Sequence, residues 1–91
     1  MELFDLRTEI DQVDLQLVNL FLKRMELSKQ IAICKMQNGL CINVPGREEE
    51  VLRSVQTQAG QEMSDYVLKL YSTLFELSKE YQQHTINNEV T

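Results

Sequence analysis

The sequence has few glycines, prolines, cysteines and histidines and no long apolar run, and each of these absences argues against one class of protein. Its 91 residues include three glycines and one proline, too few for the many turns of an all-β fold. No apolar run approaches the roughly 18 residues that cross a bilayer, and the opening MELFDLRTEID lacks the basic segment of a secretory signal. Two cysteines and one histidine cannot supply the full ligand set of a structural zinc site. We therefore expect a cytoplasmic protein with no membrane segment and no metal.

Positive charge is also scarce. Fourteen Asp and Glu against nine Lys and Arg give a net charge of -5, which argues against nucleic acid as a partner. The hydrophobic fraction of 43% and the charged fraction of 25% are those of an ordinary globular domain. Residues 1–91 make one domain, which leaves no room for a separate cofactor-binding fold. The composition therefore predicts a single helical domain that uses no cofactor.

One long helix is predicted from near Leu3 to Asn38-Gly39, where the glycine suits a C-terminal cap. Apolar residues recur along it at steps of three and four, which is a heptad seam. The seam positions are Leu3, Leu6, Ile10, Val13, Leu17, Leu20, Leu27, Ile31 and Cys34. Arg24 occupies the one seam position that is not apolar.

A shorter second helix is predicted after a connection over residues 40–46, which read LCINVPG. It opens at Arg47 with the acids Glu48–Glu50, which suit the positive end of the helix dipole. Gly60 closes it.

A third helix of medium length is predicted with Ser64 as its N-cap. Its apolar stripe of Leu68, Tyr71 and Phe75 continues into two polar residues one turn apart, Ser78 and Gln82. From Gln83 onward the sequence has no periodicity, so we expect residues 83–91 to fray.

The first helix is too long for one chain to cover. About 36 helical residues rise roughly 54 Å, whereas a compact domain of this size is about 30–35 Å across. The simplest remedy is a second copy, with the long helices packed across a two-fold axis. The predicted fold is therefore all-α, with one long, one short and one medium helix interleaved as a homodimeric helical bundle.

Polar residues at core positions carry the functional signal, because an unpaired buried charge is costly. Lys35 follows Arg24 by eleven residues, so both point to nearly the same side of the helix and could hold a small anion. A structural interpretation stays open for each: Arg24 could set the helix register, and Lys35 suits a helix C-terminus. Likewise, Ser78 and Gln82 could be a hydrogen-bonded core pair.

The order and spacing of these residues resemble the all-helical class of chorismate mutases. The matching segments are LRTEIDQVDLQLVNLFLKRMELSKQIAICK, GREEEVL and LSKEYQQ, which together cover roughly residues 3 to 83. The motif positions are Arg7, Ile10-Asp11, Arg24, Lys35, Arg47-Glu48, Ser78 and Gln82. One departure is Val44, where some relatives carry an aspartate.

The resemblance implies a homodimeric enzyme that converts chorismate into prephenate, by an intramolecular Claisen rearrangement, in the biosynthesis of Phe and Tyr. This reaction requires no metal and no cofactor. The substrate carries two carboxylates and an enol-ether oxygen that gains negative charge as its C–O bond breaks. Arginine suits the carboxylates, and lysine or a neutral amide can donate hydrogen bonds to the oxygen.

Each site residue takes its role from the resemblance. The residues expected to bind the substrate are Arg7, Arg24, Arg47, Ser78 and, through the ring hydroxyl, Glu48. The residues expected to act on the ether oxygen are Lys35 and Gln82.

Arg7 can join such a site only from a second chain. It lies 17 residues before Arg24, about 25 Å along one helix, so the two cannot reach the same small ligand from one chain. In an antiparallel dimer, Arg7 would come in trans. Two alternatives remain open at this point: an isochorismate-pyruvate lyase on the same scaffold, and a non-catalytic helical dimerisation module.

Overall fold

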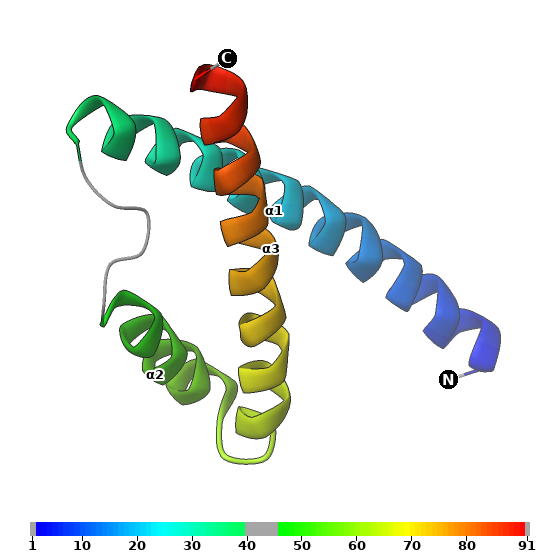
Figure 1. Ribbon diagram of the computed structural model, residues 1–91. Helices are drawn as coiled ribbons and strands as arrows, with labels where there is room; N and C mark the ends of the chain where they lie inside the picture. Colours follow the sequence, from blue (N-terminus) through cyan, green and yellow to red (C-terminus); the bar gives the residue numbers. More distant parts are fainter. Residues whose placement is uncertain (1, 40–45, 91) are drawn as a thin grey trace.

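The structure is a computed structural model that describes residues 2–39 and 46–90. These residues form three helices and no strand: α1 (Leu3–Gln37), α2 (Arg47–Ala59) and α3 (Ser64–Val90). Figure 1 shows α1 as a long rod that crosses α3, with α2 beside the half of α3 that comes first in the sequence. α3 packs against both other helices, whereas α1 and α2 do not pack against each other within the described ranges. The predicted all-α fold is confirmed.

The helix ends near glycine follow the prediction. The Asn38 side chain caps α1 by donating from Nδ2 to the Cys34 carbonyl oxygen at 2.7 Å. Gly39 follows at φ 68°, in the left-handed region that glycine tolerates best. Gly60 ends α2 at φ 84°. The rest of the predicted connection, residues 40–45 with Val44, lies outside the described residues.

The start of α3 differs from the prediction. Ser64 is the first residue of the helix rather than its N-cap, and the Met63 carbonyl accepts the first helical hydrogen bond from Val67 N. The Ser64 hydroxyl oxygen instead accepts a hydrogen bond from Gln56 Nε2 at 3.0 Å. This hydrogen bond joins the end of α2 to the start of α3.

The helix extends further than the periodicity indicated, because α3 continues through the segment expected to fray, as far as Val90. Thr85 explains the difference, since it takes the next position of the stripe after Gln82 and is only 5% exposed. Its hydroxyl donates to the Tyr81 carbonyl oxygen at 2.9 Å. A threonine reads as polar in a periodicity analysis, but a hydroxyl satisfied within its own helix can be buried.

A single chain leaves much of α1 uncovered. The molecule measures 54 × 28 × 14 Å with a radius of gyration of 16.5 Å, against about 12 Å for a compact domain of this length. Every residue from 2 to 20 is exposed, including seam residues such as Ile10 and Leu20. An apolar surface of this extent is typical of an interaction site. Within the described residues, no helix has an apolar stretch long enough to span a bilayer.

Candidate active site

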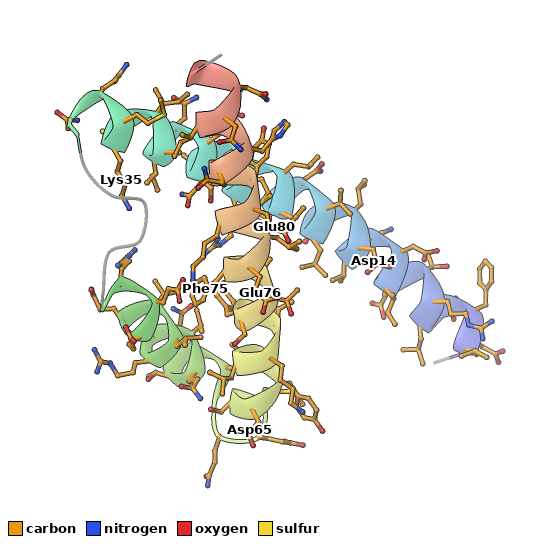
Figure 2. All side chains as sticks on the ribbon, in the orientation of Figure 1. Asp14, Lys35, Asp65, Phe75, Glu76 and Glu80 are labelled. Atoms are coloured by element: carbon orange, nitrogen blue, oxygen red, sulfur yellow. The ribbon has the colours of Figure 1, made fainter. Side chains whose placement is uncertain are left out.

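A cavity of about 310 Å³ lies where the second half of α1, the start of α2 and the middle of α3 face one another. Its volume is within the roughly 300–1,000 Å³ range of small-molecule sites. Figure 2 shows Lys35 extending from α1 toward α2, on the side of α3 from which Phe75 projects. The apolar part of the lining consists of Leu27, Ile31, Val51 and Phe75. The remainder is polar or charged, which gives a small apolar-walled site with several polar groups pointing into it.

Most of the predicted site residues meet at this cavity. Those that line it are Arg24, Lys35, Arg47, Glu48, Ser78 and Gln82. The exception is Arg7, which is exposed near the start of α1. It lies about 25 Å along the helix from Arg24. Figure 1 shows the N-terminal half of α1 extending beyond α3. One chain therefore assembles the whole predicted set except its first arginine.

Arg24 is held by neutral groups. Its Nη1 donates a hydrogen bond to Ser78 Oγ at 3.0 Å. Its guanidinium carbon lies 5.7 Å from the ring centroids of both Tyr71 and Phe75, which pack edge to face. Among the described residues, neither ion pair involves Arg24. Since π faces and a hydroxyl orient the guanidinium without cancelling its charge, the charge stays available to an anionic ligand.

Gln82 is buried at the contact between α3 and α1. It is 8% exposed, and its Nε2 donates to the Ser28 carbonyl oxygen at 3.1 Å. An amide nitrogen carries a second N–H, which remains for a ligand in the cavity. Ser78 and Gln82 therefore do not form a pair with each other: Ser78 contacts Arg24, and Gln82 contacts the α1 backbone. Each links the third helix to the first beside the cavity.

The α2 side of the cavity carries one weak and one close ion pair. Arg47 Nη1 lies 3.5 Å from Glu50 Oε1, and both side chains are largely exposed. Such a pair contributes about 0–1 kcal/mol, so it leaves Arg47 able to turn toward a ligand. Glu48 Oε1 lies 2.7 Å from Lys79 Nζ of α3.

In the part of the chain that the structure describes, sequence reasoning missed two polar lining residues, the buried Ser28 and the charged Lys79. No pattern marks Ser28, whereas Lys79 could have been noticed. It follows Ser78 directly and lies outside the 3–4 stripe of α3, so periodicity gives it no weight. The available signal was charge: Lys79 is the base in the second half of α3, and the facing helix opens with three glutamates. Complementary charges on neighbouring helices favour such a contact.

The geometry agrees with the comparisons with known proteins. The family model described as chorismate mutase type II matches residues 6–83. This chain belongs to that family. The match covers every predicted site residue, from Arg7 to Gln82, and it confirms the resemblance read from the sequence.

Individual relatives of this chorismate mutase type II chain differ greatly in length. The T-protein of Haemophilus influenzae is 46% identical over 55 residues, which are 60% of this chain and 15% of that protein. The bifunctional chorismate mutase/prephenate dehydratase of Aquifex aeolicus is 39% identical over 54 residues, 59% of this chain and 15% of that protein. This chain thus spans about 15% of the length of these two relatives.

One relative matches over nearly its whole length. The chorismate mutase of Methanocaldococcus jannaschii is 29% identical over 92 residues, covering 94% of this chain and 93% of that protein. No solved structure matches this chain significantly.

The charge of the cavity in this chorismate mutase type II chain is opposite to that of the molecule. Arg24, Lys35, Arg47 and Lys79 line it with one acid, Glu48, although the whole chain carries a net charge of -5. Figure 2 shows Glu76 and Glu80 on the side of α3 away from Phe75. A concave, positively charged site within an acidic surface concentrates field lines on a small anion. The site therefore suits a ligand with more than one negative charge.

Proposed function

We propose that this chain is a chorismate mutase that converts chorismate into prephenate in aromatic amino-acid biosynthesis. The observation that carries the proposal is the cavity, in which three helices gather Arg24, Lys35 and Arg47 with Gln82. Membership in the chorismate mutase type II family supports it, as does the match to almost the full length of a relative named chorismate mutase.

The arginines would hold the two substrate carboxylates. Arg24 projects from α1 and Arg47 from α2, so they approach the cavity from two helices. A guanidinium binds a carboxylate through two parallel hydrogen bonds, which fixes orientation as well as charge. Ser78 accepts from Arg24 at 3.0 Å, which leaves its own hydroxyl proton for the substrate. Holding both carboxylates restricts a flexible substrate to the folded conformer in which its reacting carbons meet.

The remaining polar groups would act where charge changes. In the rearrangement one C–O bond breaks while one C–C bond forms within the same molecule, so no electron or proton leaves the substrate. The ether oxygen becomes more negative as its bond breaks. The Lys35 ammonium and the second N–H of Gln82 would stabilise that charge. Glu48 would accept a hydrogen bond from the ring hydroxyl.

The apolar walls make those hydrogen bonds more effective. Phe75 and Ile31 line the same cavity as the donors. A site from which water is excluded has a lower effective dielectric constant, which strengthens each interaction with the developing charge.

We further propose that the active form is a homodimer in which Arg7 reaches the cavity of the partner chain. The exposed seam from Leu3 to Leu20 supports this, because a second antiparallel copy would bury it. The distance between Arg7 and Arg24 along α1 also supports it, since one chain cannot bring both to one ligand. A cytoplasmic location is part of the same proposal and agrees with the free thiol of Cys34.

The test is a direct assay with a matched pair of variants. Purified protein is incubated with chorismate, loss of chorismate is followed by absorbance, and prephenate is identified as the product by mass spectrometry. Arg47→Ala should lower kcat/KM strongly. Arg53→Ala, on the same helix but outside the cavity, should leave kcat/KM unchanged. If the protein instead releases pyruvate from isochorismate and forms no prephenate from chorismate, it is an isochorismate-pyruvate lyase and not a mutase.

A further inference from the structure

We propose that Lys79 is a positioning residue that holds the Glu48 carboxylate in place to accept a hydrogen bond from the ring hydroxyl of the substrate. The inference rests on the proposed function, because it assigns a specificity element to the same cavity. Lys79 lies within the matching segment LSKEYQQ but is not one of the motif positions from which the site was predicted, and the structure brings it to the cavity.

The contact between the two side chains is close and crosses between helices. Lys79 Nζ on α3 lies 2.7 Å from Glu48 Oε1 in the first turn of α2. This is the length of a charge-assisted hydrogen bond. The side chains are 48% and 38% exposed, so the pair contributes little to folding stability. Its consequence is geometric: one carboxylate oxygen points toward Lys79 on α3, which leaves the second oxygen to accept a hydrogen bond from a ligand.

The charges around the cavity explain why Glu48 needs this partner. Glu48 is the carboxylate among the described lining residues, and the ligand brings two more. An uncompensated carboxylate would repel such a dianion and would turn toward water. In the structure Arg47 lies against Glu50, and Arg24 contacts Ser78 and two aromatic rings. Among the described residues, Lys79 is the cation that forms an ion pair with Glu48, at 2.7 Å.

A residue that acts through Glu48 has a distinctive kinetic signature. The ring hydroxyl does not change its charge during the rearrangement, so a hydrogen bond to it stabilises the bound substrate and the transition state alike. Losing such uniform binding raises KM and leaves kcat nearly unchanged. The effect should also require both Glu48 and the hydroxyl. Direct contact of Lys79 with a substrate carboxylate would require neither.

The experiment compares four proteins on two substrates. The proteins are the wild type, Lys79→Gln, Glu48→Gln and the double variant. The substrates are chorismate and an analogue of chorismate that lacks the ring hydroxyl. With chorismate, Lys79→Gln should raise KM about three- to fivefold and change kcat less than about twofold. It should have no further effect in the Glu48→Gln protein or on the analogue. Lys79→Arg should restore most of the affinity.

The control is Lys69→Gln, which removes the same charge from an exposed position of α3 outside the cavity and should behave as wild type. A Lys79→Gln effect of equal size in the Glu48→Gln background would overturn the inference, because Lys79 would then contact the substrate itself. Wild-type kinetics in Lys79→Gln would overturn it as well. A wild-type protein that makes no prephenate would instead remove the proposed function, and this inference with it.

Discussion

Replacing Gln82 with glutamate changes one group, an amide NH₂ for an oxygen, at the point where α3 meets both α1 and the proposed substrate. In the structure, Nε2 donates to the Ser28 carbonyl oxygen at 3.1 Å, and both residues are less than 10% exposed (8% and 7%). An ionised carboxylate can only accept, so it would face that carbonyl oxygen with no proton between them. A buried group deprived of its hydrogen bond costs about 1–3 kcal/mol, and a charged one costs more.

The cost depends on pH in a direction that can be derived. Burial and the facing carbonyl oxygen raise the pKa of the introduced carboxyl above about 4.3, the ordinary value of a glutamate. Below about pH 4.3 the carboxyl is protonated in both the folded and the unfolded state. In the folded state it then donates to the Ser28 carbonyl oxygen, and the substitution costs little stability. As pH rises through the raised pKa of the folded state, the stability is lost. A loss of about 1–3 kcal/mol corresponds to a pKa raised by roughly one to two units.

Two measurements test Gln82→Glu. Urea unfolding followed by circular dichroism, at one fixed protein concentration, should give near wild-type stability at about pH 4.5 and a loss of about 1–3 kcal/mol at pH 7.5. The value of kcat/KM should fall over the same range, because an ionised carboxylate repels the negative charge growing on the ether oxygen, while the wild type stays comparatively flat.

Gln83→Glu is the matched control. Gln83 is exposed, and its Nε2 donates to Asn87 Oδ1 on the surface of the same helix at 3.2 Å. The substitution makes the same atomic change and the same change in net charge, and we expect less than about 0.5 kcal/mol of destabilisation at either pH. If Gln82→Glu matches this control in both stability and pH profile, Gln82 lies outside the reacting centre and its contact with Ser28 is dispensable.

Three further predictions concern the assembly and the ammonium group. Sedimentation equilibrium at micromolar protein should give twice the mass of one chain, and a fully active monomer would contradict the role of Arg7. Arg7→Ala and Arg24→Ala should each be nearly inactive. Mixing them should restore close to half the wild-type activity per mixed dimer, since one of its two sites is then intact. If no activity returns although subunit exchange is confirmed, Arg7 and Arg24 do not act in the same site. Lys35→Ala should stay folded, as judged by circular dichroism, and its kcat should fall by a factor of about 10²–10³. Near-normal turnover would show that Lys35 does not act on the ether oxygen.

The helices could be predicted because their signals are local. The seam of α1 follows from apolar spacing, and its end follows from Asn38 and Gly39, which the structure shows capping the helix. The end of α3 could not be predicted in the same way. Thr85 is buried with its hydroxyl satisfied inside the helix, and no rule of spacing distinguishes such a threonine from a solvated one.

The site was predictable to the extent that its residues break a pattern. Arg24 interrupts an apolar seam, and Ser78 and Gln82 continue an apolar stripe. Each is therefore a polar residue at a position where the spacing predicts an apolar one, and it can be recognised from the sequence. Lys79 breaks no apolar pattern, because it lies beside the stripe of α3. Its position at the cavity depends on the ion pair with Glu48 of the neighbouring helix. The rings of Tyr71 and Phe75 were predicted as packing residues, and their contact with the Arg24 guanidinium depends on the crossing of α1 and α3. Contacts of this kind exist only once the helices are arranged in space.

The arrangement of α1 and α2 gives the ligand a structural part to play. Within the described residues the two helices do not pack on each other, yet each supplies one cationic wall of the cavity. Each of the two helices packs against α3. A dianion that contacts Arg24 and Arg47 together would therefore bridge α1 and α2, the one pair of helices in the described residues that is not packed together. A ligand that binds only the folded chain also raises its stability by mass action: at a concentration 100 times the dissociation constant, the gain is about 2.7 kcal/mol. While it stays bound, such a ligand would connect two helices that do not pack on each other within the described residues.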